Sequence, residues 1–437
     1  MQFLSDLTRL KPSAIPTRWV RRGTLAVIDQ GVFSGANFIV SILLARWMSE
    51  RDYGAYAYIF AIFLLISGFY NVLLLEPMSI FGPVRHARHF MSYLRQLIGL
   101  HALSAAISTV GLMAVWAAVT LIRSDRWLLD AFVGMSLGHG LTLFFWLLRR
   151  ACYARHQPGK ALAGTLVYSI ALIGGLYLLE STARLTLFSA FVWMGMAGVI
   201  GGVFQYAILR PDSIPRSAAP AATPRELIRE NWYYGRWMLI ASAFSWLSMW
   251  AYFVIAGSLL NLEEIAGLKA IQNIVMPMTQ AVTAFTLLFA PWASERFALQ
   301  GMEALKDGMR AFSALLALLC LLYFVPVWLF RDTLMDWLYG GKFALSAWIL
   351  LFFLLQLFVT AVTASWYYGL RIIARTRDVM ILYVIGGATT LAAGPPLIAV
   401  WELPGAVAGI VLSSLTPLPV LVSMWNKAEI RQIARNG

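Results

Sequence analysis

The chain has 437 residues, of which 60% are hydrophobic and only 13% are charged, and its formal net charge is +13. Soluble domains carry roughly 25% charged residues, so this composition excludes a soluble protein and predicts an integral membrane protein. Two cysteines in a chain of this length exclude a fold built on disulfide bonds.

Apolar runs of about 20 residues predict twelve membrane-spanning helices. The predicted spans lie at about 24–45, 55–76, 95–121, 129–149, 161–179, 186–209, 236–260, 267–290, 310–331, 345–369, 379–400 and 405–425. The longest polar connection is rich in Pro, Ala and charged residues, as a linker would be. We therefore predict an all-α polytopic membrane protein with an N-terminal six-helix bundle at 1–209, a cytoplasmic linker at 210–235 and a C-terminal six-helix bundle at 236–437.

The distribution of basic residues predicts the orientation of these helices. Lys and Arg are concentrated in the connections on one side of the membrane, whereas Asp and Glu are shared about equally between the two sides. The positive-inside rule then places both termini of this multi-pass protein in the cytoplasm. Membrane topology and attraction to anionic lipid account for the excess of basic over acidic residues. The bilayer is the expected partner, and no nucleic acid is expected.

A short internal repeat supports the division into two halves. Segment 50–57 reads ERDYGAYA and segment 263–270 reads EEIAGLKA, and each follows the first span of its half. The helices that come next end in LLLEP and LLFAP. Because six spans separate the two copies, both start on the same side of the membrane, which is typical of parallel repeats.

Several spans carry polar residues at helical spacing, beginning with Gln30, Ser34, Asn37 and Ser41 at i, i+4, i+7 and i+11. A polar stripe in a membrane helix faces protein or water, because lipid cannot satisfy it. Two interpretations remain open: the side chains line a cavity, or they bond backbone carbonyls and let helices pack closely. The predicted cavity-lining residues are Gln30, Ser34, Asn37, Asn71, Tyr252, Gln272, Thr279, Gln356 and Thr360.

Three titratable residues within spans are candidates for ion coupling or a gate. They are Asp29, Glu76 and His139. A carboxyl at that depth is unfavourable unless it is paired, hydrated or protonated, so each acid could serve coupling or could be a structural salt bridge. His139 could relay protons or could simply pack through a hydrogen bond.

Basic residues at the ends of spans would matter for an anionic substrate. Arg46, Arg149 and Arg236 are the candidates for anion contact, since guanidinium offers paired donors to phosphate. The alternative is that they anchor the helix ends at the membrane surface.

The sequence lacks the motifs of common catalytic and nucleotide sites. There is no P-loop, no HExxH zinc motif and no GxSxG elbow. We therefore expect no enzymatic activity, no metal site and no cofactor. Ion coupling through H⁺ or Na⁺ is then a possible energy source.

Four stretches together resemble one transporter family. DQGVFSGANFIVSILLARWMSERDYGAYAY begins at Asp29, GSLLNLEEIAGLKAIQNIVMP covers 257–277, LYGGKFALSAWILLFFLL covers 338–355 and LPGAVAGIVLSSL covers 403–415. They are similar to the Wzx-type O-antigen and polysaccharide flippases of the multidrug/oligosaccharidyl-lipid/polysaccharide (MOP) exporter superfamily. The resemblance spans nearly the whole chain. One departure is that no Lys or Arg is predicted deep in a span, where family members often keep basic residues.

The resemblance implies two six-helix bundles, alternating access and a specific substrate class. That substrate is an undecaprenyl-diphosphate-linked oligosaccharide, flipped from the cytoplasmic to the outer leaflet for lipopolysaccharide or exopolysaccharide synthesis. Polysaccharide polymerase and chain-length machinery are the implied protein partners. Two alternatives remain: a cation-coupled multidrug antiporter of the same superfamily, and a non-transporting membrane component of a polysaccharide assembly complex.

Overall fold

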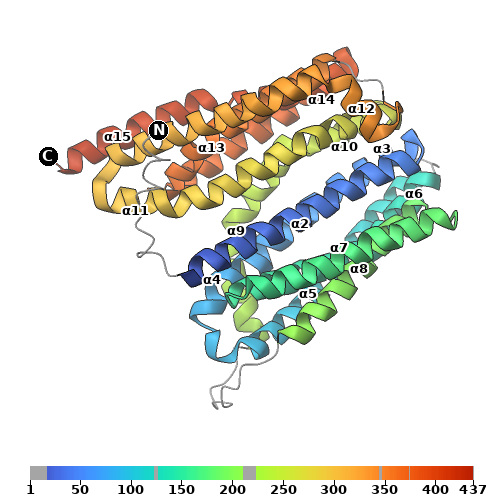
Figure 1. Ribbon diagram of the computed structural model, residues 1–437, viewed down its shortest axis with the longest axis horizontal. Coiled ribbons are helices and arrows are strands. Elements are labelled where there is room, and N and C mark those ends of the chain that lie inside the picture. The colour runs from blue at the N-terminus through green and yellow to red at the C-terminus, as the bar shows by residue number, and fades with distance from the viewer. Residues whose placement is uncertain (1–16, 123–125, 210–222, 344–346, 374, 437) are drawn as a thin grey trace. The chain divides into compact units, whose positions relative to one another are not determined.

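The structure is a computed structural model that describes every residue except 1–16, 123–125, 210–222, 344–346, 374 and 437. Within these described residues the chain is almost entirely helical and contains no β-strand (Figure 1). The predicted all-α fold is therefore confirmed. The contacts between residues divide the chain into two compact units. We call residues 16–243 the N unit and residues 244–437 the C unit.

The N unit begins with two long helices that correspond to the first two predicted spans. All its elements in chain order are α2 (Thr17–Trp47), α3 (Glu50–Tyr70), the π-helix η1 (Asn71–Leu75), α4 (Glu76–Val84), the 3₁₀ turn η2 (Ala87–His89), α5 (Phe90–Ile122), α6 (Arg126–Ala154), α7 (Pro158–Ser181), α8 (Leu187–Ile208) and α9 (Pro224–Met249). Helix α9 continues past the boundary between the units.

The C unit contains longer and more interrupted helices. Its further elements are α10 (Ala251–Leu259), α11 (Leu262–Leu329), α12 (Arg331–Tyr339), α13 (Ala347–Ile372), α14 (Thr376–Leu415) and α15 (Leu418–Asn436). Helix α11 is kinked at Gly301 (φ 79°) and α14 at Glu402 (φ 52°). The kink in α11 falls between the eighth and ninth predicted spans, and the kink in α14 falls between the eleventh and twelfth.

The two copies of the internal repeat both fold as capped helix starts. The Ser49 hydroxyl accepts a hydrogen bond from the Asp52 backbone N–H at 3.1 Å at the start of α3. The Asn261 side chain accepts one from the Glu264 backbone N–H at 2.9 Å at the start of α11. In both copies an N-cap residue and acidic residues in the first turn fix where the helix begins.

Helices α6 and α8 pack so closely that glycine is required at their contact. A Cβ atom on Gly138 would lie 2.2 Å from the carbonyl oxygen of Phe191, and one on Gly195 would lie 2.8 Å from the Cα of Gly138. Small residues allow such backbone approach in membrane helices, where dispersion contacts replace the hydrophobic effect as the driving force. This contact makes α6 a fixed support for the polar residues that it carries.

The helices have the length and apolarity of membrane spans. Among the described residues nine helical stretches pass this test, and a tenth passes if the bent pair α9–α10 is counted as one span. The stretch Arg377–Lys427 is 51 residues long, and a crossing needs about 20. The eighth predicted span, 267–290, is helical within α11 but is not among the nine stretches.

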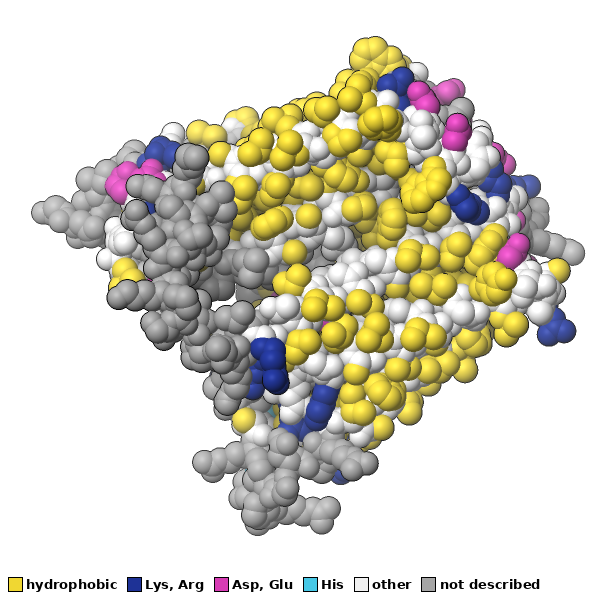
Figure 2. All heavy atoms as spheres, in the orientation of Figure 1, with side chains coloured by type: hydrophobic (Ala, Val, Ile, Leu, Met, Phe, Trp, Pro, Cys, Tyr) yellow, Lys and Arg dark blue, Asp and Glu magenta, His cyan; other side chains and the backbone are white. Residues whose placement is uncertain are grey.

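Large apolar side chains are exposed along these helices. Figure 2 shows hydrophobic side chains over long stretches of the surface, with Lys, Arg, Asp and Glu toward the helix ends. Ile170 and Val400 are each 73% exposed and Val110 is 69% exposed. Soluble proteins rarely expose apolar surface on this scale, so these faces contact lipid.

A helix begins within the segment 210–235 that the sequence predicts to be a linker. Residues 210–222 lie outside the described residues, whereas α9 begins at Pro224. The backbone N–H of Thr223 donates to the Glu226 carboxylate at 2.7 Å and the Thr223 hydroxyl accepts from the Glu226 backbone N–H at 3.3 Å. This reciprocal capping, with proline at the first helical position, starts a helix inside the segment predicted to be a connection. Hydrogen bonds to its carboxylate from the backbone N–H and the side chain of Thr223 lower the pKa of the exposed Glu226 carboxyl.

Candidate functional site

A buried ion pair joins α2 to α6 in the N unit. The Asp29 side chain is fully buried, and its Oδ2 atom lies 2.7 Å from Nη2 of Arg149 and 2.9 Å from Nε. The hydroxyl of Tyr153 donates to the same carboxylate oxygen. Nη2 of Arg149 also donates to the Gln30 amide oxygen at 3.0 Å. An ionised carboxylate accepts several charge-assisted bonds in this way.

Neighbouring side chains on α2 hold this pair in place. The guanidinium of Arg149 lies over the Phe33 ring at 4.6 Å, a favourable contact between a cation and an aromatic face. The Gln30 amide donates to the Ser34 hydroxyl at 3.1 Å. One turn of α2 thus supplies an anion, an amide and an aromatic face to one arginine. Two predicted sites, the polar stripe of α2 and Arg149, meet here.

A second cluster surrounds the π-helix between α3 and α4. Arg150 donates to the Asn71 amide oxygen at 3.2 Å, and the Asn71 amide donates to the Glu76 carboxylate at 3.0 Å. The Tyr234 hydroxyl on α9 donates to the other Glu76 oxygen at 3.4 Å. Asn71 and Glu76 are the first residue of η1 and the first residue of α4.

The local sequence explains the π-helix. Pro77 follows Glu76 and has no backbone N–H to donate, and its ring would clash with the carbonyl of residue 73 in a regular α-helix. The helix widens to a single π turn at this point, and such turns, although rare, are frequent at functional sites. Gly235 of α9 packs on this wider turn, because a Cβ there would lie 3.1 Å from the Val72 carbonyl oxygen.

The other N-unit candidates lie outside the contacts just described. The Asn37 amide donates to the Phe33 carbonyl of its own helix at 2.7 Å. His139 is buried, with Nε2 2.7 Å from the Ser108 hydroxyl and Nδ1 3.0 Å from the Ser136 carbonyl. Arg236 lies over the Tyr233 ring at 4.8 Å. Arg46 is in the last turn of α2, about 25 Å along the helix from Asp29.

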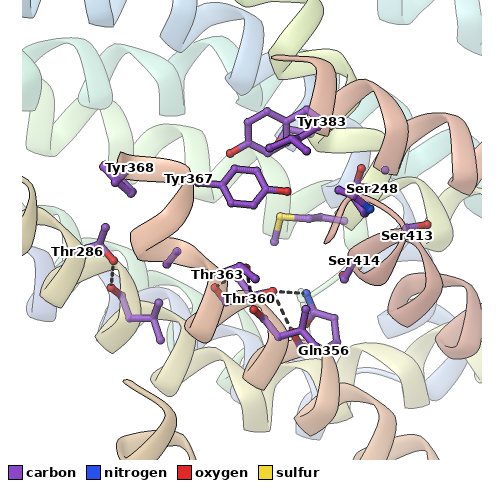
Figure 3. Close-up of a pocket in the computed structure, with 18 of the residues that line it drawn as sticks. Ser248, Thr286, Gln356, Thr360, Thr363, Tyr367, Tyr368, Tyr383, Ser413 and Ser414 are labelled. Carbon is purple, nitrogen blue, oxygen red and sulfur yellow. Dashed lines mark hydrogen bonds between the residues drawn. The ribbon is translucent and has the colours of Figure 1, made fainter. Parts of the chain in front are cut away.

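The C unit contains a cavity of about 300 Å³, and most of the residues that line it carry a hydroxyl or amide side chain. Figure 3 shows Tyr367 and Tyr383 above Gln356, Thr360 and Thr363 of α13. The Gln356 amide donates to the Thr360 hydroxyl at 3.0 Å, and the Thr360 hydroxyl donates to the Gln356 carbonyl at 2.9 Å. The other polar lining residues are Ser245, Ser248, Thr283, Thr286, Tyr368, Arg371, Ser413 and Ser414. We call this cavity the hydroxyl pocket.

The charge of the hydroxyl pocket is distinctive. Arg371 is its one charged residue, and no carboxylate occurs among the described residues that line it. Gln356 and Thr360, which the sequence analysis names as cavity-lining candidates, are among the residues that line it. A pocket of this kind offers donors, acceptors and tyrosine faces to a neutral or anionic ligand and offers nothing to neutralise a cation.

Tyr252 packs inside the C unit. It is fully buried and shares a hydrogen bond of 2.9 Å with the Ser413 hydroxyl. A Cβ on Gly409 would lie 2.5 Å from its ring. The Tyr252 side chain thus braces α10 against α14.

Lys269 is a buried cation that the sequence analysis did not anticipate. Its side chain is on α11, only 5% exposed, and Nζ donates to the Gln272 amide oxygen at 2.8 Å. Nζ also lies 5.3 Å from the centre of the Trp250 ring and 5.9 Å from that of Phe253. The sequence analysis selected Gln272 for its polarity but did not consider Lys269. A residue three positions earlier lies on the same helix face, so the spacing could have identified the pair. Thr279, another predicted cavity-lining residue, donates to the Val275 carbonyl of its own helix α11 at 3.2 Å.

No group of three or more His, Cys, Asp or Glu side chains within the described ranges could hold a metal ion. The candidate sites consist of ion pairs, amides, hydroxyls and aromatic rings.

Comparisons with solved structures show the fold. An inward-facing multidrug resistance MATE family transporter of the MOP superfamily matches with a TM-score of 0.75 at 12% identity, over 93% of this chain and 96% of that chain. An outward-facing transporter of the same family matches with 0.65 at 15% identity, over 96% and 97%. The lipid II flippase MurJ in an inward closed conformation matches with 0.68 at 10% identity, over 93% and 87%. At these identities the likeness concerns the fold alone.

The sequence comparison gives the family. No curated protein matches the sequence. Residues 20–297 match the family described as "Polysaccharide biosynthesis protein", and this stretch is more than half of the chain. The chain therefore belongs to the polysaccharide biosynthesis protein family and has the fold of the MOP superfamily, as its resemblance to polysaccharide flippases predicts.

Proposed function

We propose that the protein is a flippase that moves a lipid-linked oligosaccharide from the cytoplasmic to the outer leaflet of a bacterial inner membrane. Alternating access of the two units would carry the substrate, and the protein itself would catalyse no reaction. Polysaccharide polymerase and chain-length proteins would use the product. The family supports a role in polysaccharide synthesis, and the fold is one that transporters share.

The observation that carries this proposal is the chemistry of the hydroxyl pocket. Sugars present hydroxyl groups that both donate and accept, and the pocket presents serine, threonine, tyrosine and glutamine side chains that do the same. Tyr367 and Tyr383, with ring centres 5.8 Å apart, offer flat faces to the apolar side of a sugar ring. A volume of about 300 Å³ is at the lower end of the range for ligand pockets, so part of a glycan would fit.

The distribution of charge favours this function over a cation antiporter. An exporter of cationic drugs would gain from a carboxylate in its binding pocket, and the described lining residues of the hydroxyl pocket include none. Asp29, the candidate for ion coupling, is already neutralised by Arg149. An H⁺- or Na⁺-coupled cycle would have to break that pair in each turnover. We infer that Asp29 and Arg149 act as an internal brace of the N unit.

Transport in proteoliposomes tests the proposal. The purified protein would be reconstituted with a fluorescent undecaprenyl-diphosphate oligosaccharide, and the fraction of label exposed to an external quencher would be followed over time. Thr360→Val and Gln356→Leu each remove polar groups from the hydroxyl pocket. For either variant, we expect translocation to slow about fivefold for every hydrogen bond between protein and glycan that the substitution removes.

Thr333→Val is the matched control. Thr333 is an exposed threonine of α12 and does not line the hydroxyl pocket, so its replacement should leave translocation within about twofold of wild type. If wild-type protein moves cationic dyes but leaves the lipid-linked glycan in place, the antiporter is the correct function. If neither substrate moves, and the chain is still required for polymer synthesis in cells, the protein is a non-transporting assembly component.

A further inference from the structure

A second cavity of the C unit lies beside the hydroxyl pocket. It has a volume of about 370 Å³ and is bounded by α11, α13 and α15. Its cationic wall is formed by Lys306 and Arg310, its floor includes Trp366 and Trp425, and Leu421 and Val422 form its apolar side. We call it the basic cavity.

The cations of the basic cavity are placed to meet an anion. Lys306 and Arg310 are four residues apart on α11 and so lie on one face, one turn apart. Arg310 also contacts Asp307 at 3.2 Å, but both side chains are more than half exposed (59% and 65%). Exposed pairs of this kind contribute little, so a phosphate can displace the Asp307 carboxylate. Guanidinium binds phosphate through paired, charge-assisted bonds.

The floor of the basic cavity is rigid and apolar. The rings of Trp366 and Trp425 meet edge to face with centres 5.6 Å apart, and the Trp425 indole N–H donates to the Trp366 carbonyl at 3.3 Å. Gly369 makes room for this arrangement, because a Cβ there would lie 2.2 Å from Sδ of Met309 and 2.7 Å from the Trp425 ring. Val422 next to this floor is 59% exposed. A hydrocarbon chain can therefore leave the cavity along α15.

The two cavities adjoin at one residue, and together they offer the kinds of group that one class of molecule would need. Thr363 of α13 lines both the hydroxyl pocket and the basic cavity. The linings include hydroxyl groups in the first cavity, and two cations and an apolar helix face in the second. A glycan joined through a diphosphate to an isoprenoid lipid presents sugar hydroxyls, phosphate charge and hydrocarbon.

We infer that the basic cavity binds the diphosphate and the first isoprenoid units of the lipid carrier whose glycan occupies the hydroxyl pocket. This assignment rests on the proposed function. It assigns Lys306 and Arg310 as the anion-binding residues of the C unit. The distribution of basic residues predicts that this end of α11 faces the cytoplasm, where a lipid-linked glycan is made.

Binding of undecaprenyl diphosphate without a sugar tests the site directly. The full-length protein would be placed in nanodiscs of phosphatidylcholine, and the dissociation constant for the labelled probe would be measured for wild type, Lys306→Gln, Arg310→Gln and the double variant. We expect the double variant to bind about tenfold more weakly or worse, since two charge-assisted contacts are lost. Arg377→Gln is the matched control, because Arg377 is an exposed arginine of the C unit that does not line the cavity. Thermal melting of each variant verifies folding.

Competition and transport separate the possible outcomes. Undecaprenol, which lacks phosphate, should compete poorly. If phosphatidylglycerol displaces the probe as well as unlabelled undecaprenyl diphosphate does, the cavity serves bulk anionic lipid and the inference is wrong. The inference is also wrong if the double variant binds the probe as tightly as wild type does. In that case the proposed function still stands if Thr360→Val slows translocation. If the probe needs Lys306 and Arg310 but wild-type protein moves no lipid-linked glycan, the site stands and the proposed function fails.

Discussion

Replacing Arg149 by methionine should destabilise the N unit more than replacing both members of the Asp29–Arg149 pair. At the 2.7 Å separation of the pair, an effective dielectric constant of about 20 gives an attraction of about 6 kcal/mol. Desolvation offsets part of this, and removing one partner of a buried pair costs about 3–5 kcal/mol. Asp29 is fully buried, so Arg149→Met leaves an uncompensated carboxylate. The double variant Asp29→Asn/Arg149→Met leaves none and should recover much of the loss.

Thermal melting in detergent provides the assay. For a unit of about this size, 1 kcal/mol shifts the melting temperature by roughly 2–4 °C, so Arg149→Met should melt about 10 °C below wild type. Asp29→Asn alone should have a smaller effect, because Arg149 keeps the Gln30 oxygen and the Phe33 ring as partners. The reasoning is refuted if Arg149→Met melts like wild type, or if adding Asp29→Asn lowers the melting temperature further.

Three further substitutions test packing and capping. Gly138→Ala places a Cβ 2.2 Å from the Phe191 carbonyl oxygen and should cost about 1–3 kcal/mol by separating α6 from α8; an unchanged melting temperature would show that the contact is looser. Tyr252→Phe removes a 2.9 Å hydrogen bond to Ser413 and should cost about 1 kcal/mol of stability, with translocation unchanged. A transport defect at normal stability would instead place Tyr252 in the substrate path. Thr186→Ala removes the capping box of α8 and should cost about 1 kcal/mol, measured by melting, and retention of full stability would count against this role.

The sequence predicted helices well because hydropathy is a local property. In the described part of the chain every predicted span is mostly helical, since a run of about 20 apolar residues has few alternatives in a membrane. The seventh span is interrupted at Trp250, and the twelfth at Thr416 and Pro417. The bend of 50° between α9 and α10 was not predicted. It lies at Trp250, where neither proline nor glycine marks a break. The sequence could have predicted that α9 begins at Pro224, before the predicted span at 236–260, because Thr223, Pro224 and Glu226 form a capping signature.

The candidate site was predicted only in part, because its partners are distant in sequence. Polar spacing identified Gln30 and Gln356, whose bonds to Ser34 and Thr360 lie within one helix. The pairing of Asp29 with Arg149 joins residues 120 positions apart. Such a contact depends on how α2 and α6 pack, which periodicity does not report.

The paired charges of the N unit have a consequence for how the membrane potential acts on the protein. Asp29 and Glu76 carry two negative charges, and Arg149 and Arg150, which bond to Asp29 and through Asn71 to Glu76, carry two positive ones. A potential of 100 mV does about 2.3 kcal/mol of work on each elementary charge that crosses the membrane. Because these four charges sum to zero, moving the cluster along the field without rotating it involves no net work. The membrane potential acts on such a cluster only through a rotation of its dipole or through the loss of one of its charges.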